Sequence, residues 1–401
     1  MKQVDVLVNR EKVGNLFYNK SNNTYGFNYI SDSAPVSLIM PYRKSTYSWK
    51  SRLHPTFDMN MPEGYLLEIF KNILSKEYGY MNDFLLFSYL APSIKGRVSF
   101  ISEFDTDTFG SIDLEDVLYN DTPDTFTMLL NRFLKKNSIS GVQPKTIARL
   151  NRHSSLNIEE YIVKTWGEEF PKLAENEYFC LKAVEESGVP IPEIILSKNS
   201  RFLLVKRFNY DKNGAYLGFE EVLGLLGRDR DQKYSGSYEQ VAKVIYRVST
   251  DKQQDMIYLY KTIVMSYLLK NGDAHLKNFG ILYSADFSSI RLSPTYDVVN
   301  SSVYMFNDKP ALTMFGKKLW FGQKELVKFG VVSFYFSESE SLTYYNQCIE
   351  SLKATISRLE SYISDNKEFK TIGLRMIDTF KVSLNRTTHK ELPDDAIRSW
   401  T

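Results

Sequence analysis

The stretch NGDAHLKNFGIL, residues 271–282, places an aspartate, a histidine, a lysine and an asparagine within six positions, between two hydrophobic segments. Asp273 and Asn278 are five residues apart, and Asp297 follows further along the chain. Two aspartates and an asparagine supply hard oxygen donors, which suit Mg²⁺ better than zinc. Phosphoryl transfer needs such a set, with one carboxylate to orient and deprotonate a hydroxyl and oxygen ligands to hold metal on the phosphates.

A lysine on an upstream strand, to steady the phosphates, would complete this set, and Lys164 in YIVKTW is placed for that role. Each residue alone also has a structural interpretation. An aspartate after a helix is commonly a turn residue, His275 a structural hydrogen-bonding group, and a strand lysine such as Lys164 can simply extend toward solvent. The motif SGVQPK lacks the glycine density of a P-loop. The order of the pieces favours chemistry, because it resembles the catalytic core of a protein kinase.

The elements around these residues are expected to be buried and rigid. A strong helix follows Asp251 and ends at Asn271–Gly272, so the polar loop begins where a core helix stops. Loops held by a rigid scaffold are the usual location of catalytic groups. The segments FGILYS and SIRLSPTYDVV predict two short strands, with Asp297 at the end of the second. Residues from about 320 to 390 are predicted to be helical.

Upstream, the segment from about 125 has an α/β pattern. EEYIVKTW and RFLLVKRF predict strands that flank the helix AENEYFCLKAVEESG, while MLLNRFLKKN predicts a helix and SISGVQPK a turn. Residues 1 to about 100 predict a mostly β module that ends in helices. In this module QVDVLVN and KVGNLFYN form a hairpin, NTYGFNYI continues it, and PEGYLLEIFKNILSKEYG forms a helix that stops at Gly79.

Composition limits the function classes. The 401 residues are 43% hydrophobic and 24% charged, with a net charge of +2, which gives no case for a nucleic-acid coat. Cys180 and Cys348 are the two cysteines, so a disulfide framework and a cysteine zinc site are excluded. MIYLYKTIVMSYLL is too short to span a bilayer, and the start of the chain lacks the apolar run of a signal peptide. We expect a cytoplasmic protein.

Six motifs together resemble the HipA-like serine/threonine kinase toxins. They are SISGVQPK (138–145), YIVK (161–164), ENEYFCLKAVEESGV (175–189), LLVKRFNYD (203–211), NGDAHLKNFGIL (271–282) and PTYDVV (294–299). VNREKVGNLFYN and HPTFDMNMPEG are similar to the family's N-terminal subdomain. The resemblance covers nearly the whole chain and is most specific from 138 to 300.

The resemblance implies an α+β, bilobed protein-kinase-like fold with ATP and Mg²⁺ as cofactors. Residues 1–105 would form the N-terminal, mostly β subdomain with its helices. Residues 125–210 would form the kinase N-lobe with the nucleotide loop and the Lys164 strand, and residues 211–401 the helical C-lobe with the catalytic and metal-binding loops.

The resemblance also assigns roles by position. Asp273 would be the catalytic base, Asn278 and Asp297 would bind metal, and Lys164 would hold the phosphates. Ser138, with Ser140 as a second candidate, would be autophosphorylated and so limit the activity. The other residues expected at the nucleotide are Ser140, Gly141, Val142, Gln143, Pro144, Lys145, Lys206, Arg207, Phe208, His275, Leu276, Lys277 and Tyr296.

Family resemblance further implies partners. A HipB-like helix-turn-helix antitoxin would restrain the kinase and make most of the DNA contact, and the protein substrate would be a translation component such as an aminoacyl-tRNA synthetase. No membrane partner is expected. Two alternatives remain at this stage: a pseudokinase that binds an antitoxin without catalysis, and a metal-dependent nuclease or phosphatase that uses Asp273, His275 and Asp297.

Overall fold

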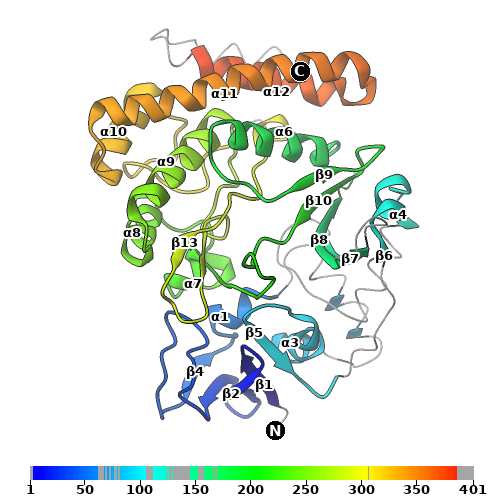
Figure 1. Cartoon of the computed structure of the whole chain (residues 1–401), viewed down its shortest axis with the longest axis vertical. Coiled ribbons are helices and arrows are strands. Elements are labelled where there is room, and N and C mark those ends of the chain that lie inside the picture. Colours follow the sequence, from blue (N-terminus) through cyan, green and yellow to red (C-terminus); the bar gives the residue numbers. More distant parts are fainter. Residues whose placement is uncertain are drawn as a thin grey trace. The chain divides into compact units, whose positions relative to one another are not determined.

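The chain is represented by a computed structural model (Figure 1), which describes residues 3–61, 67, 70–71, 74–75, 79, 82–104, 112–122, 124–125, 129, 145–151, 158–165, 167, 169–305 and 307–385. It divides into two compact units, each built from several segments. The first unit comprises Met1–Gly167, Glu193–Lys233 and Gly280–Ile290, and the second comprises Glu168–Pro192, Tyr234–Phe279 and Arg291–Thr401. The domain boundaries given above for residues 1–105, 125–210 and 211–401 stay a prediction.

An antiparallel sheet with strand order β4-β3-β2-β1-β5 occupies the N-terminal part of the first unit. Its strands are β1 (Gln3–Val8), β2 (Glu11–Asn19), β3 (Thr24–Tyr29), β4 (Tyr47–Lys50) and β5 (Val98–Ile101). Val4, Val6 and Val8 are buried, which is the alternation that the sequence showed. The predicted hairpin is confirmed, and its turn consists of Asn9 and Arg10, whose positive φ angles match the right-handed twist of the strands.

A second sheet of the first unit has the order β6-β7-β8-β10-β9. Its strands are β6 (Ile112–Asp113), β7 (Lys145–Asn151), β8 (Ile158–Thr165), β9 (Ile194–Leu196) and β10 (Phe202–Lys206). The predicted strands at EEYIVKTW and RFLLVKRF are therefore confirmed. A third, three-stranded sheet has the order β11-β12-β13, with β11 at Gly218–Glu221, β12 at Gly280–Tyr283 and β13 at Ile290–Leu292.

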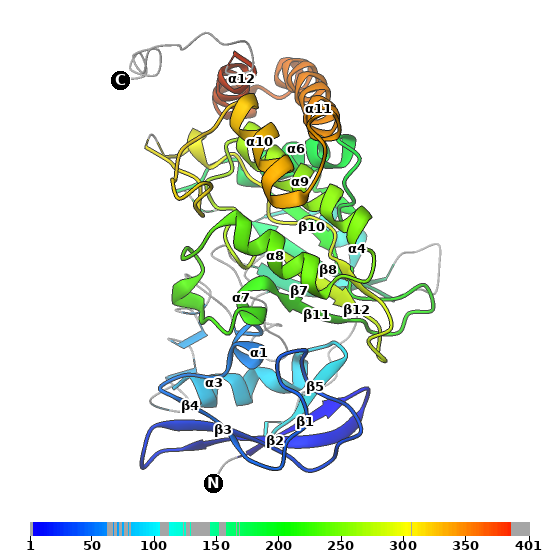
Figure 2. The same cartoon turned by 90° about the vertical axis from the view of Figure 1, so that its left-hand side faces the viewer.

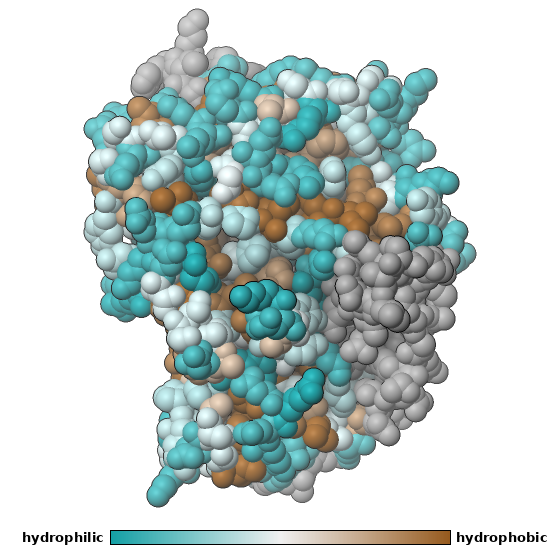
Figure 3. Space-filling model, in the orientation of Figure 1, coloured by the Kyte–Doolittle hydropathy of each residue, from teal (hydrophilic) through white to brown (hydrophobic). Residues whose placement is uncertain are grey.

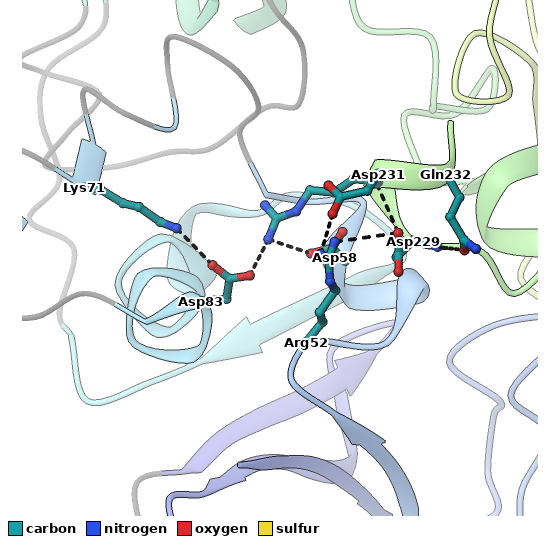
Figure 4. A network of polar contacts seen from close by, with 8 residues as sticks. Arg52, Asp58, Lys71, Asp83, Asp229, Asp231 and Gln232 are labelled. Carbon is teal, nitrogen blue, oxygen red and sulfur yellow. Dashed lines mark hydrogen bonds and ion pairs between the residues drawn. The ribbon is translucent and has the colours of Figure 1, made fainter. Parts of the chain in front are cut away.

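Ion pairs join distant segments of the first unit (Figure 4). Arg230, in the 3-10 helix η2 (Arg230–Gln232), forms ion pairs with Asp58 at 3.5 Å and with Asp83. Asp58 ends helix α1 (Pro55–Asp58), and Asp83 begins helix α3 (Asp83–Leu90). Arg52 pairs with Asp229 at 3.6 Å and with Asp231. Segment 229–231 is therefore bound to the N-terminal module.

Helices build the second unit, and Figures 1 and 2 show α11 and α12 side by side over α6 and α9. They are α6 (Leu173–Glu186), α8 (Tyr238–Val248), α9 (Lys252–Leu268), α10 (Gln323–Phe334), α11 (Glu338–Asp365) and α12 (Lys370–Asn385). The shorter described helices of the chain are α4 (Leu114–Tyr119), α7 (Val222–Leu225), η1 (Ala91–Ser93), η3 (Ser301–Val303) and η4 (Lys367–Phe369).

Helix α9 is the central element of the second unit. Its buried residues include Leu259, Tyr260, Ile263 and Val264, and it contacts α6, α8, α10, α11 and α12. The side chain of Asp251 caps its first turn by accepting a hydrogen bond from the N–H of Gln254 (3.3 Å). The predicted helices in this unit are confirmed over their described residues, and sheets with helices confirm the α+β class.

Two predicted helices lie wholly or largely outside the described residues, namely those at 62–79 and 128–137, and so does the turn at 138–145. The face in Figure 3 is mostly hydrophilic where the structure describes it, with hydrophobic residues in smaller patches. Among the described helices, none combines the length and the apolar character needed to cross a membrane.

Candidate active site

Helix α9 ends at Leu268, so the polar loop starts before the Asn271–Gly272 stop that the sequence predicted. Leu269 caps the helix, and Lys270, with φ of 58°, takes the left-handed conformation that often follows a helix. Asn271 then closes a tight turn. Its side-chain oxygen accepts from the N–H of Asp273 (3.2 Å), and its own N–H donates to the carbonyl of Ser266 (2.8 Å).

Position 272 favours glycine because the Asp308 side chain approaches its backbone closely, and not because of its φ angle. Its N–H donates to Oγ of Ser301 (2.6 Å), and that hydroxyl also contacts Oδ2 of Asp308 (2.5 Å). A Cβ at position 272 would lie 2.2 Å from the Asp308 carboxylate. Burial raises the pKa of Asp308, and the negative charge of Asp273 raises it further. The segment after Asp297 thus holds the backbone just before Asp273.

Asp273 is partly exposed, and its carboxylate is oriented by a tyrosine. Oδ1 of Asp273 accepts a hydrogen bond from the hydroxyl of Tyr234 (2.7 Å). The ring of Tyr234 also meets the ring of His275 edge to face, with centroids 5.1 Å apart. A partly exposed carboxylate with one fixed oxygen is suited to accept a proton from a substrate hydroxyl.

Asn278 closes the loop through the backbone. The N–H of His275 donates to Oδ1 of Asn278 (3.0 Å) and to the carbonyl of Asp273 (2.8 Å), while the N–H of Asn278 donates to the carbonyl of His275 (3.0 Å). Ala274 and Leu276 are buried and anchor the loop in the core. His275 is buried too, and its backbone N–H and carbonyl hold the turn, while the role of its side chain stays a prediction.

The segment that contains Asp297 is tied to this loop by one hydrogen bond. The hydroxyl of Tyr296, the residue before Asp297, donates to the carbonyl of Lys277, the residue before Asn278 (2.7 Å). Asp297 has φ of 55°, in the left-handed region. Strand β13 ends at Leu292, so the predicted strand 289–299 is much shorter than expected and Asp297 lies in the segment beyond it.

The donor set of Asn278 and Asp297 fits Mg²⁺ chemically. One carboxylate and one amide oxygen leave most ligand positions to water and to substrate phosphates, which is the usual pattern for magnesium in phosphoryl-transfer sites. Among the residues that the structure describes, no group of three or more His, Cys, Asp and Glu gathers to hold a metal ion. The dense cluster typical of two-metal hydrolases is therefore not found among them.

The first unit brings two expected nucleotide residues together. Lys164, on β8, is buried, with 4% of its surface exposed, and its backbone lies opposite Lys145 on β7 and Leu203 on β10. Lys206 ends β10, and its ammonium pairs with Glu193 (3.1 Å).

The two residues after Lys206 also have neighbours in the first unit. Arg207 donates to the carbonyl of Lys95 (2.6 Å), and the Phe208 ring meets that of Phe219. Nucleotide contacts at 206–208 stay a prediction. Ser138, Ser140, Gly141, Val142, Gln143 and Pro144 lie outside the described residues.

Comparison with known protein families decides the classification. A family model described as the HipA-like C-terminal domain matches residues 137–357, and one described as the HipA N-terminal domain matches residues 4–101. The chain belongs to the HipA-like family. The resemblance stated from the six motifs is thereby confirmed.

Relatives of this HipA-like protein include a protein of Haemophilus influenzae that carries the name of a candidate kinase. The two are 34% identical over 187 residues, which cover 42% of this chain and 53% of the relative. A protein of Sinorhizobium fredii with a similar name is 28% identical over 204 residues, covering 45% and 49% respectively. The chain therefore spans about half the length of these two relatives.

The fold of this HipA-like protein is found among solved structures. A chain of the Shewanella oneidensis toxin–antitoxin complex of HipA, HipB and operator DNA matches with a TM-score of 0.69. The match covers 97% of this chain and 100% of that chain, at 16% sequence identity. The expected HipA-like fold is thus confirmed.

Sequence reasoning missed three residues that shape the candidate site: Tyr234, Ser301 and Asp308. It named Asn271 only as part of the helix stop, although an Asn two positions before an Asp is also a common turn signal. Tyr234 and Ser301 act across 39 and 29 residues, and contacts at such separations leave no periodic pattern in a sequence.

Proposed function

We propose that this protein is an ATP- and Mg²⁺-dependent serine/threonine protein kinase. The observation that carries the proposal is the loop after α9, where Asp273 presents a partly exposed carboxylate, Asn278 lies five residues on, and Tyr296 ties the segment of Asp297 to the loop. The placement of Lys164 on a central strand, and membership of a family whose relatives carry kinase names, support it further.

In this mechanism Asp273 accepts the proton of the attacking hydroxyl through Oδ2, while Tyr234 holds Oδ1. Asn278 and Asp297 would hold Mg²⁺, which when bound neutralises charge on the phosphates. Lys164 binds the phosphates, and the loop Ser140–Lys145 covers them. Lys206, Arg207 and Phe208 contact the adenine, while His275, Leu276, Lys277 and Tyr296 lie beside the nucleotide.

We further propose that the kinase is the toxin of a type II toxin–antitoxin system and acts in the cytoplasm. Its partner would be a HipB-like antitoxin, by analogy with the Shewanella oneidensis complex, whose components are HipA, HipB and operator DNA. Its substrate would be a translation component such as an aminoacyl-tRNA synthetase. Expression of the active enzyme without a cognate antitoxin should arrest growth, and unimpaired growth would contradict the toxin assignment.

Self-limitation by autophosphorylation belongs to the same proposal. A phosphate on Ser138, or on Ser140 as second candidate, adds about −1.5 to −2 charges beside the expected site of the ATP phosphates, so like-charge repulsion would weaken ATP binding. Incubation with Mg·ATP and peptide mass spectrometry should find phosphate within residues 138–140. An unimpaired Ser138→Asp kinase would remove this switch.

The decisive test is transfer of label from γ-labelled ATP to protein, with and without Mg²⁺, for the wild type and for Asp273→Asn. Magnesium-dependent transfer that is lost in Asp273→Asn supports the kinase. ATP binding without transfer in the wild type would instead identify a pseudokinase. Release of inorganic phosphate or cleavage of nucleic acid without labelled protein would favour a hydrolase. Phosphoproteomics after brief expression, with Asp273→Asn as control, would then identify the substrate.

A further inference from the structure

Tyr234 touches the proposed catalytic loop at two points. Its hydroxyl donates to Oδ1 of Asp273 over 2.7 Å, and its ring lies edge to face with that of the buried His275. A third contact fixes its main chain, because Nζ of Lys318 donates to the Tyr234 carbonyl (3.2 Å). An exposed tyrosine held at its hydroxyl, ring and backbone has few positions available to it.

We propose that Tyr234 is a positioning residue that selects which oxygen of Asp273 acts as the base. This inference rests on the proposed kinase function. The Tyr234 hydroxyl occupies Oδ1, so Oδ2 is the oxygen that accepts the proton of the substrate hydroxyl. An ionised carboxylate accepts hydrogen bonds on both oxygens, so a donor on one of them fixes rotation of the group without blocking the other.

A competing role for Tyr234 would be to imitate the substrate. Its hydroxyl lies at hydrogen-bond distance from the base, where a substrate hydroxyl must also lie during transfer. The contacts with His275 and Lys318 favour positioning, because a blocking group must leave when substrate arrives and these contacts hold it in place. The two roles predict opposite effects of removing the hydroxyl.

The test compares Tyr234→Phe with Tyr246→Phe. Tyr246 lies on α8 of the same unit and is 42% exposed, as is Tyr234, so the two substitutions remove equally accessible hydroxyls. The assay measures transfer of label from γ-labelled Mg·ATP to dephosphorylated casein. For Tyr234→Phe we expect kcat to fall roughly 10- to 100-fold, with KM for ATP unchanged. Tyr246→Phe should match the wild type.

Each outcome decides one point. Wild-type kcat in Tyr234→Phe would overturn the positioning role. A rise in kcat, or phosphate found on Tyr234 by mass spectrometry, would assign the substrate-mimic role instead. If wild type labels neither casein nor itself, or if Asp273→Asn labels as well as wild type, the proposed kinase function fails, and that result is distinct from an effect confined to Tyr234.

Discussion

Lys164 lies in the middle of a sheet, where backbone pairing with Lys145 on one side and Leu203 on the other fixes its place. Asp273 lies in a loop, where contacts with a few side chains fix its place instead. Tyr234 orients its carboxylate, while Ser301 and Asp308 hold the residue before it. The strand position depends on many equivalent backbone hydrogen bonds, and the loop position on a few specific ones.

This difference predicts how each of the two positions responds to substitution. A side chain on a central strand can be exchanged without moving its neighbours, because the register is shared among all residues of the ladder. A loop residue held by long-range side-chain contacts moves when one of those contacts is lost. Substitutions at Lys164 should therefore act through chemistry alone, and substitutions around Asp273 through geometry as well.

The largest effect is expected from Asp273→Asn. Loss of a positioned base typically costs ~10²- to 10⁴-fold in rate, so label transfer from γ-labelled ATP should nearly vanish. The urea midpoint should stay near that of wild type, because the substitution is isosteric. Asp251→Asn makes the same change at the other end of α9, where asparagine is an equally good helix cap, and should leave transfer intact. Full turnover in Asp273→Asn would refute the base assignment.

Lys164→Met should lower turnover roughly 10²-fold by removing a charge that stabilises the phosphates, while the sheet keeps its register. The matched control is Lys261→Met, since Lys261 is also buried but donates to the carbonyl of Ser187 (2.7 Å). That control should lower the unfolding midpoint and spare ATP affinity. Equal ATP affinity in wild type and Lys164→Met, measured by titration calorimetry, would remove Lys164 from the nucleotide site.

Gly272→Ala tests how sharply the loop is constrained. The added methyl would meet the Asp308 carboxylate, so we expect a loss of roughly 1–3 kcal/mol in the free energy of unfolding, together with reduced turnover. Gly224→Ala, where no atom lies within 4 Å of the new Cβ, is the control. In an Asp308→Ala background the cost of Gly272→Ala should largely disappear in a double-mutant cycle. An unchanged cost there would show that the carboxylate is not the obstacle.

Substitution of two buried ionisable groups should have the smallest effect on activity. It should also give the clearest contrast between the units in how stability depends on pH. In the first unit, burial and then the charge of Arg43 lower the pKa of His54 from 6.5 to about 3. As the pH falls, the His54 ring takes up a proton in the unfolded chain before it does so in the folded chain. The free energy of unfolding therefore decreases as the pH falls from 6.5 toward 3. In the second unit, burial raises the pKa of Glu175 from 4.5 to about 8, against the opposing charge of Lys172. In the folded chain the Glu175 carboxyl keeps its proton at pH values where the unfolded chain has lost it. The free energy of unfolding therefore decreases as the pH rises from 4.5 through 8.

Urea midpoints between pH 4 and 9 test both signs. His54→Asn, which keeps an acceptor for the N–H of Thr56, should flatten the acid side, and Glu175→Gln should flatten the alkaline side. Either variant with the pH dependence of wild type would contradict the assignment for that group.

The sequence could predict the helices and strands, and it named Asp273, Asn278 and Asp297 as candidates, but it could not predict the contacts that hold these residues in place. The alternation in residues 3–8 and the apolar face of α9 mark a strand and a buried helix, because both patterns are local. The Asp273…Asn278 spacing is local too. The αL residue at Lys270 and the approach of Asp308 to Gly272 depend on tertiary packing, which overrides the preference for glycine at a helix end.

Each unit is assembled from segments that alternate along the chain, and this bears on synthesis at the ribosome. Strand β11 of the first unit pairs with β12, which emerges only with residues 280–283. The contacts of the loop around Asp273 with Ser301 and Asp308 can form only later in synthesis. Those of α9 with the helices up to residue 385 form later still. Since folding during translation proceeds from the N-terminus, the contacts that hold the loop around Asp273 can form in a nascent chain only after residue 308 has been made. A chain released before that residue would lack the contacts of Ser301 and Asp308 with this loop.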